Sequence, residues 1–285
     1  KIECISKHLP VIKKIIVIDP IEIEGDKWIL FDDVIQSGLG FLEKKLDKFE
    51  ERRKSVQESD YATICYTSGT IADPKGVILT HRNYTANVEQ ALDKFPLASS
   101  YRTLLILPWD HSFAHTAGLY TMITAGACVA SVQQGNTTVE TLKNIPQNIK
   151  DTKPVFLLSV PALAKNFRNN IEKEIRNKGR LAYRLFQFAL RVGYFYIGSG
   201  MNTGKGKRAL VKPLYNLFNH LLFSKIRQGF GGSLQFFVGG AALLDIELQR
   251  FFYAIGLPMY QGYGLTEAAP IISANDPKNT KLGTS

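Results

Sequence analysis

The stretch Tyr66–Val77 reads YTSGTIADPKGV and directly follows a run of β-branched and apolar residues that predicts a strand. Within it, Ser68, Gly69 and Thr70 can turn the chain sharply and offer backbone N–H groups and hydroxyls. Lys75 adds a positive charge where the oxygens of a phosphate would lie. Backbone donors beside a cation form an anion-binding site. The stretch therefore predicts a phosphate-binding loop at the end of a strand.

This loop differs from a Walker loop in its spacing. Counted from Gly69, the position that a Walker loop gives to glycine holds Pro74, and no serine or threonine follows Lys75. The spacing therefore excludes a Walker loop.

Apolar, β-branched runs alternate with stretches of helical spacing along the chain. Strands are expected at Ile15–Ile18, Ala62–Tyr66, Thr103–Leu107, Cys128–Val132, Val155–Leu158 and Leu234–Val238, and helices at Asn83–Phe95, Val139–Ile149 and Ala162–Asn177. The uncharged stretch Phe113–Val132 is interrupted by glycines, so we interpret it as a buried helix, a turn and a strand rather than a membrane span. The alternation predicts an α/β fold: a doubly wound, largely parallel sheet with flanking helices and with ligand loops at the carboxyl ends of its strands.

The positive charge of the chain is concentrated in one segment. The 285 residues carry a net charge of +10, with 45% hydrophobic and 21% charged residues, a globular composition that excludes disorder as the main state. Residues 151–235 hold 15 basic and 3 acidic side chains, a net charge of +12, whereas the parts before and after it each carry −1. A basic patch indicates either an anionic partner or a solvated face.

The two ends and the cysteines give broader expectations. The sequence starts at Lys1 without an initiator methionine, a signal peptide or a lipidation motif, so we expect an internal fragment. Cys4, Cys65 and Cys128 show no CxxC spacing, which favours reduced thiols in a cytoplasmic protein.

Further motifs lead to a family resemblance. Tyr66–Asn83 (YTSGTIADPKGVILTHRN) resembles the phosphate loop of the adenylate-forming superfamily, which includes acyl-CoA synthetases, luciferases and peptide-synthetase adenylation domains. Leu107–His111 (LPWDH) resembles the Leu-Pro-x-x-His motif of that superfamily, and Gly239–Ala242 (GGAA) and Gln261–Glu267 (QGYGLTE) follow in the family's order. The segment Phe223–Leu243 looks most like the long-chain fatty acyl-CoA synthetase branch.

The resemblance implies a fold and a reaction. Residues 1–285 would form part of the large AMP-binding domain, incomplete at both ends and without the small C-terminal domain that carries the family's catalytic lysine. We therefore expect the isolated fragment to be inactive. In the family reaction, a carboxylate attacks the α-phosphate of ATP to give an acyl-adenylate and pyrophosphate, and the thiol of coenzyme A then displaces AMP. Mg²⁺, lysine and hydrogen-bond donors stabilise the negative charge that gathers in both steps.

The same resemblance implies which residues bind the phosphates. Those of the loop would hold the β- and γ-phosphates: Thr67, Ser68, Gly69, Thr70 and Lys75. The loop departs from the usual family pattern at two positions, because Ile71 stands where a second threonine is usual and Ala72 where glycine is usual. The loss of that hydroxyl would cost about 1–3 kcal/mol if it bonds phosphate in the family.

For adenine, the resemblance implies contact with Gly239, Gly240 and Ala241 on one face and with Tyr263 on the other. In the Gln261–Glu267 motif, Gly262 and Gly264 would allow the tight backbone path that this contact needs. Gln261 would also form part of the nucleotide site. Taken alone, Tyr263 is also consistent with a buried aromatic residue.

The resemblance implies four catalytic residues, which are Lys75 and three residues outside the loop. Thr266 would bond the α-phosphate, Glu267 would hold Mg²⁺, and His111 would lie near the acyl carboxylate. Each has a simpler alternative: Glu267 could be a helix N-terminal charge, and His111 a packed or capping histidine. No acidic residue completes a zinc motif around His111 and His115.

The basic segment 181–226 favours two amphipathic helices, Leu181–Ile197 and Ala209–Ile226, joined by the glycine-rich loop Gly198–Gly206. One hypothesis is peripheral contact with an anionic membrane that supplies the fatty acid. Attraction of ATP and coenzyme A is a second, and an apolar stripe packed on the sheet with a solvated cationic back is a third. A nucleic-acid partner is disfavoured because the basic residues lie on apolar stretches without a known RNA or DNA motif.

Three functions thus remain open. The first is an ATP-dependent long-chain fatty acid–CoA ligase. The second is an adenylating ligase with another acceptor or acid, such as an acyl-carrier protein or an aryl or amino acid. The third is a nucleotide- or membrane-binding relative without catalysis.

Overall fold

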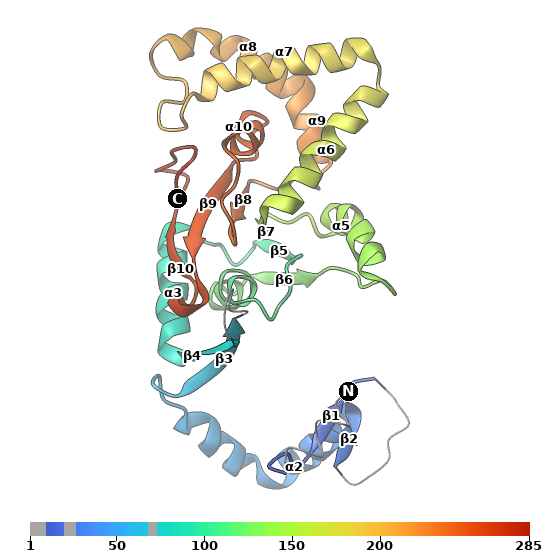
Figure 1. The fold of residues 1–285 in the computed structure, drawn as a ribbon, viewed down its shortest axis with the longest axis vertical. Coiled ribbons are helices and arrows are strands. Elements are labelled where there is room, and N and C mark those ends of the chain that lie inside the picture. The colour runs from blue at the N-terminus through green and yellow to red at the C-terminus, as the bar shows by residue number, and fades with distance from the viewer. Residues whose placement is uncertain (1–9, 20–26, 68–72) are drawn as a thin grey trace. The chain divides into compact units, whose positions relative to one another are not determined.

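The computed structural model describes residues 10–19, 27–67 and 73–285, which divide into two compact units, Lys1–Glu58 and Ser59–Ser285 (Figure 1). In the first unit, β1 (Ile15–Val17) pairs in parallel with β2 (Trp28–Leu30). Helix α2 (Phe31–Ser55) follows, bends at Lys45 and buries none of its residues. The strand expected at Ile15–Ile18 is confirmed, whereas β2 and α2 were not anticipated.

The second unit is built on a six-stranded sheet in the order β10-β9-β8-β7-β5-β6. Its strands are β5 (Arg102–Leu105), β6 (Cys128–Ser131), β7 (Phe156–Ser159), β8 (Phe236–Gly239), β9 (Met259–Gly264) and β10 (Ile271–Ala274). All neighbours pair in parallel except β9 and β10. Along the chain the five parallel strands take the spatial order second, first, third, fourth, fifth, which is a doubly wound order with its switch point between β5 and β7. The predicted α/β class is confirmed.

Alternate residues of each central strand supply two separate cores. In β8, Phe237 enters the larger core together with apolar residues of α5 (Thr138–Thr152), α6 (Pro161–Asn177), α7 (Arg180–Ile197) and α10 (Ile246–Ala254). Phe236 enters the core on the opposite face, where its ring stacks on Phe156 at a centroid distance of 5.6 Å. Because successive side chains of a strand point to opposite faces, the run of apolar residues in β8 serves both cores.

The segment Phe113–Val132 folds as expected from its glycines. A π-helical turn (Ala114–Tyr120) continues into α4 (Thr121–Thr124), Gly126 turns the chain with φ +65°, and β6 begins two residues later. The three predicted helices correspond to α3 (His81–Lys94), α5 and α6.

A hairpin replaces the expected βαβ connection around the phosphate loop. Strands β3 (Tyr61–Thr67) and β4 (Lys75–Thr80) pair antiparallel in a sheet of their own, with Thr67 opposite Lys75. The prediction of a parallel βαβ unit is therefore wrong for this part of the chain, because β3 is followed directly by β4, its antiparallel partner strand. Helix α3 starts immediately after β4, where Thr80 and Asn83 form a reciprocal capping box.

The basic segment consists of α7 and a broken second helical stretch that lies beside it (Figure 1). The second stretch changes its hydrogen-bonding pattern from a 3₁₀ turn (Gly206–Val211) to α8 (Lys212–Phe218), a π turn (Asn219–Phe223) and α9 (Ser224–Gln228). The two helical regions are confirmed, although the second is not one regular helix. None of the described helices is both long enough and apolar enough to cross a bilayer.

The division between core and surface leads to a stability test. Leu157 in β7 is fully buried, so Leu157→Ala leaves a cavity between sheet and helices and should lower the free energy of unfolding by about 2–5 kcal/mol. Leu217 in α8 is 51% exposed, and Leu217→Ala serves as the matched control with a loss below about 1 kcal/mol. Urea unfolding of both variants checks the assignment, and equal losses would contradict it.

Candidate functional site

A cavity of about 560 Å³ lies at the carboxyl ends of β7, β8 and β9 and extends along the sheet face that α3 flanks. It contains the segment after β5 as well, and so includes the switch point of the sheet, where doubly wound folds bind their ligands. Seven of the predicted site residues line it: His111, Gly240, Ala241, Gly262, Tyr263, Gly264 and Thr266. Motifs that are 130 residues apart in sequence therefore share one cavity.

Those of the remaining predicted residues that the structure describes do not line this cavity. Ser68, Gly69, Thr70 and the two departures Ile71 and Ala72 lie outside the described residues. Thr67 and Lys75 face each other across the β3–β4 hairpin, which holds the two ends of the phosphate loop together. Gly239 ends β8, Glu267 is exposed in a 3₁₀ turn (Thr266–Ala268), and Gln261 is buried.

Gln261 is bonded within the protein rather than directed at a ligand. Its side-chain oxygen accepts a hydrogen bond from the backbone N–H of Leu244 at 2.8 Å. Its amide nitrogen donates to the carbonyl of Gly262 at 2.6 Å and to that of Ala242 at 3.3 Å. The side chain therefore ties the GGAA turn to β9, and both its oxygen and its amide nitrogen are hydrogen-bonded within the protein.

The glycines of the site differ in what they make room for. A Cβ atom at Gly264 would lie 2.1 Å from the carbonyl oxygen of Pro270, and one at Gly240 would lie 2.9 Å from the ring of Phe113. At Gly239 the nearest atom would be 3.7 Å away, an ordinary contact. Gly264 is thus required by close backbone packing, and a side chain at Gly240 would have to displace the Phe113 ring. Gly239 is buried and meets only ordinary contacts.

Asn87 of α3 is a site-supporting residue that the sequence analysis missed. It is buried, its amide nitrogen donates to the carbonyls of Ile271 at 2.8 Å and Ala268 at 3.3 Å, and its oxygen accepts from the N–H of Ile271 at 3.1 Å. These three bonds fix the chain on either side of the cis peptide Ala269–Pro270, directly after the GLTE sequence. An asparagine in a helix pattern gives no local signal of such a bond, because its partners are more than 180 residues away.

The two histidines near the cavity have separate roles. His111 is exposed, lines the cavity and opens the helical turn, since its carbonyl accepts from Ala114 N–H at 2.9 Å. His115 lies outside the lining: its ring nitrogens are 3.2 Å from the carbonyl oxygen of Trp109 and 3.1 Å from the hydroxyl of Tyr84. Burial lowers the pKa of His115, which favours the neutral ring. Of the two, only His111 is placed to approach a substrate.

The exposed carboxylate of Glu267 is the donor type that Mg²⁺ prefers. Within the described residues, no group of three His, Cys, Asp or Glu side chains gathers into a metal cage. Mg²⁺ commonly binds through one or two carboxylates together with water and substrate phosphates. Glu267 therefore fits a nucleotide-dependent Mg²⁺ site, with oxygens of the substrate completing the shell.

Comparison with known families agrees with this arrangement. A family model described as AMP-binding enzyme matches residues 5–285. The chain belongs to the AMP-binding enzyme family. Among its curated relatives, the long-chain-fatty-acid–[acyl-carrier-protein] ligase AEE15, chloroplastic, of Arabidopsis thaliana is 30% identical over 82% of this chain and 34% of that protein. Long-chain-fatty-acid–CoA ligase 1 of Saccharomyces cerevisiae is 30% identical over 79% of this chain and 31% of that protein.

Solved structures share the fold of this AMP-binding enzyme. The anthranilate CoA ligase AuaEII, in complex with anthranoyl-AMP, superimposes with a TM-score of 0.61 and 19% identity over 99% of this chain and 42% of that one. ATP-bound MatB from Rhodopseudomonas palustris gives a TM-score of 0.50 and 17% identity over 80% of this chain and 33% of that one. The chain spans about a third of the length of the curated relatives it matches.

The crowding at Gly264 predicts a difference between two glycines of the site. Gly264→Ala should lower the free energy of unfolding by about 1–3 kcal/mol, because the added methyl group collides with the Pro270 carbonyl. Gly239→Ala is the matched control and should leave stability within about 1 kcal/mol of the parent, since its methyl group finds ordinary contacts. Thermal unfolding measures both. A Gly239→Ala variant that is the less stable of the two would contradict the assignment.

Proposed function

We propose that the protein activates a long-chain fatty acid with ATP and transfers the acyl group to coenzyme A. In the first step, a carboxylate oxygen attacks the α-phosphate of ATP, and pyrophosphate leaves. In the second step, the thiol sulfur of coenzyme A attacks the acyl carbonyl, AMP leaves, and the thiol proton passes to solvent. Relatives named as long-chain fatty acid ligases support this substrate class.

The observation that carries the proposal is the division of the cavity into a polar end and an apolar wall. Gly240, Ala241 and Tyr263 line the polar end, where Ala241 and Tyr263 are exposed and accessible to a nucleotide base. The apolar wall is made by Leu97 and by side chains on the α3-flanked face of the sheet: Phe156, Leu158, Phe236 and Val238. A nucleotide at one end and a hydrocarbon chain against the other would place the carboxylate between them.

The proposed roles of individual residues follow from this placement. Tyr263, 55% exposed, offers its ring to adenine, and Thr266 offers a hydroxyl to the α-phosphate. His111 lies at the same cavity, where its ring can bond the acyl carboxylate. Lys75 would stabilise the charge on the β- and γ-phosphates from the end of the hairpin. Mg²⁺ bound at Glu267 would supply further charge stabilisation for the same phosphates.

Two alternatives use the same cavity with a different outcome. One is transfer to an acyl-carrier protein, which the name of the AEE15 relative suggests, or activation of another carboxylic acid. The other is nucleotide binding without catalysis. Product analysis separates these functions, because every ligase releases pyrophosphate with its acid, and the ligases differ in which acid they activate or in which thiol accepts the acyl group. A protein that only binds the nucleotide releases no pyrophosphate.

Pyrophosphate release tests the proposal in the full-length protein. With Mg·ATP, release should depend on fatty acid and peak with long chains, and acyl-CoA should form when coenzyme A is added. Lys75→Ala should lower the rate at least about tenfold, because a charged hydrogen bond contributes about 1.5–3 kcal/mol. Lys143→Ala, which removes an exposed lysine from α5, should leave the rate unchanged. Release that peaks with an aryl or amino acid, or no release with any acid, would overturn the proposal.

A second candidate function is peripheral membrane contact of a cytoplasmic enzyme through the basic segment 181–226. The apolar residues of α7 divide between two faces. One face packs into the larger core, whereas Leu181, Leu185, Phe188 and Phe195 are exposed. The neighbouring stretch exposes Leu210, Leu217 and Leu221, and the segment holds seven basic and no acidic residues. Exposed apolar side chains with surrounding cations are typical of helices that lie on anionic membranes.

Vesicle binding tests this contact. Leu181→Ser combined with Leu210→Ser should weaken binding to phosphatidylserine-containing vesicles about tenfold, since each leucine is more than 80% exposed and free to enter the bilayer surface. The matched control, Val139→Ser with Leu142→Ser, removes two exposed apolar residues from α5 and should bind like the parent. Cosedimentation with phosphatidylcholine vesicles gives the electrostatic share, about 1 kcal/mol per engaged cation. Equal pelleting in both lipids would contradict an electrostatic contact.

A further inference from the structure

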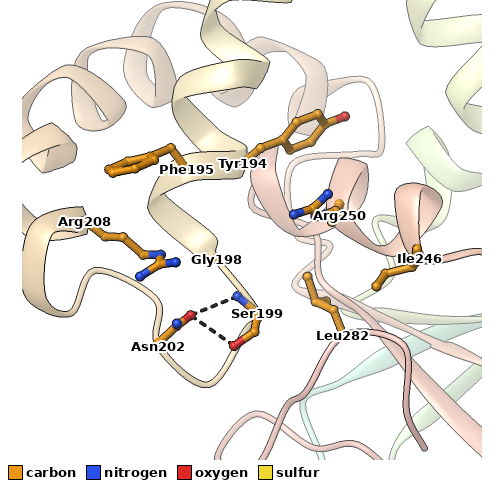
Figure 2. A pocket seen from close by; sticks show the side chains of 9 residues that line it. All are labelled: Tyr194, Phe195, Gly198, Ser199, Asn202, Arg208, Ile246, Arg250 and Leu282. Carbon is orange, nitrogen blue, oxygen red and sulfur yellow. Dashed lines mark hydrogen bonds between the residues drawn. The ribbon is translucent and has the colours of Figure 1, made fainter.

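A second cavity of about 580 Å³ lies between the carboxyl end of α7, the 3₁₀ turn that contains Arg208, α10 and the C-terminal segment (Figure 2). It shares no lining residue with the cavity at the carboxyl ends of the sheet. Figure 2 shows Arg208 and Arg250 on opposite sides of it, with the guanidinium group of each directed toward the space between them. Its other described lining residues carry no charge.

The guanidinium group of Arg208 lacks an acceptor. Its Nε is shielded from solvent and has no hydrogen-bond partner, and the side chain forms no hydrogen bond or ion pair with any other described residue. Among the described residues, it makes one cation–π contact, with the ring of Phe195, whose centroid lies 5.9 Å from the guanidinium carbon. A donor that is shielded from solvent without a partner costs free energy, although the Arg208 side chain as a whole is only partly buried. An anion in the cavity would supply acceptors for its terminal amino groups.

Arg250 keeps donors free on the other side. One of its terminal nitrogens bonds Glu247 at 2.9 Å, which is a neighbour on the exposed surface of α10. This single bond leaves the other guanidinium N–H groups available. The nearby carboxylate of Glu172 is itself paired with Arg168 at 2.9 Å. No acidic side chain among the described residues therefore occupies the cavity.

The backbone is shaped to hold Arg208 in place. Gly198 has φ +59°, and a Cβ atom there would lie 2.5 Å from Nε of Arg208 and 2.3 Å from Oδ1 of Asn202. That Asn202 oxygen accepts hydrogen bonds from the N–H and the hydroxyl of Ser199 at 2.9 Å and 3.1 Å (Figure 2). The carbonyl of Ser199 in turn accepts from Leu282 N–H at 2.9 Å. The predicted glycine-rich loop is thus an ordered wall, and its glycine leaves the room that the guanidinium group fills.

We infer that this second cavity binds a phosphate group, held between the guanidinium groups of Arg208 and Arg250. A phosphate monoester offers three oxygens and a double negative charge, so it can accept from two guanidinium groups that approach from opposite sides. Phe195 lines the cavity and also belongs to the exposed apolar face of α7. The phosphate can therefore come from a lipid head group, with the acyl chains on that apolar face, or from a free phosphate in solution.

Calorimetric titration of the full-length protein tests the inference, with inorganic phosphate and monomeric dihexanoyl phosphatidic acid as probes. Arg208→Gln and Arg250→Gln should each weaken phosphate binding about tenfold or more, because each removes charged hydrogen bonds. Arg102→Gln makes the same change on an exposed residue at the start of β5, outside both the cavity and the basic segment, and should bind like the parent. Arg208→Lys retains the charge without the fork and should bind with intermediate affinity.

The outcomes distinguish the source of the phosphate. Tighter binding of phosphatidic acid than of inorganic phosphate, lost in Arg208→Gln and absent with dihexanoyl phosphatidylcholine, identifies a lipid head group. Equal affinity for both phosphates, again lost in that variant, identifies a free phosphate. Unchanged affinity in both glutamine variants, at unaltered thermal midpoints, overturns the inference. If either glutamine variant unfolds, the other variant and Arg208→Lys provide the same comparison.

Discussion

The alternation of side chains in β8 is the constraint on which the rest of the structure depends. Phe237 packs against the helices of one face and Phe236 against the rings of Phe156 and Phe95 on the other. A one-residue shift in register would therefore move each ring to the opposite face, into a core that is shaped for other side chains. The GGAA turn begins at the end of this strand. Its position at the cavity is therefore set by packing on both faces of the sheet, and Gln261 then fixes the turn through hydrogen bonds to its backbone. Asn87 does the same for the chain at Ala268 and Ile271.

Much of the fold could be predicted from the sequence because the central strands are short apolar runs bounded by turn residues. Strands β5 to β8 and helices α3, α5 and α6 were anticipated for this reason. Strand β9 contains MYQGYG, whose glycines and polar residues weaken a strand pattern, and its place follows from pairing with β8. The β3–β4 hairpin was missed since its turn lies in a long loop rather than in a two-residue turn signal. Helix α2 was missed although Ile35, Leu39, Leu42, Leu46 and Phe49 recur at the spacing of an amphipathic helix, and none of these residues is buried in the structure.

The candidate site could be predicted where its residues belong to short sequence motifs that end neighbouring strands. Gly240, Gly264, Tyr263 and Thr266 meet at one cavity because two motifs end adjacent parallel strands. Contacts between distant segments gave no signal: Asn87 resembles any helix residue, and the role of Gln261 within the fold depends on the turn that it faces. A motif thus identifies which residues gather at a site, whereas hydrogen bonding decides which of them remain free for a ligand.

The same distinction applies to the basic segment, where net charge alone cannot separate structure from function. Arg227 donates to Asn219 and to the carbonyl of Ile255, both at 2.7 Å, and burial lowers its pKa. Arg168 pairs with Glu172 and lies over the ring of Phe251. These cations have protein partners and stabilise the packing of helices on the sheet. Arg208 belongs to the same excess of charge but has no such acceptor in the part of the chain that the structure describes. A partner outside the chain is therefore best sought where a cation is held in place by the fold but not neutralised by it.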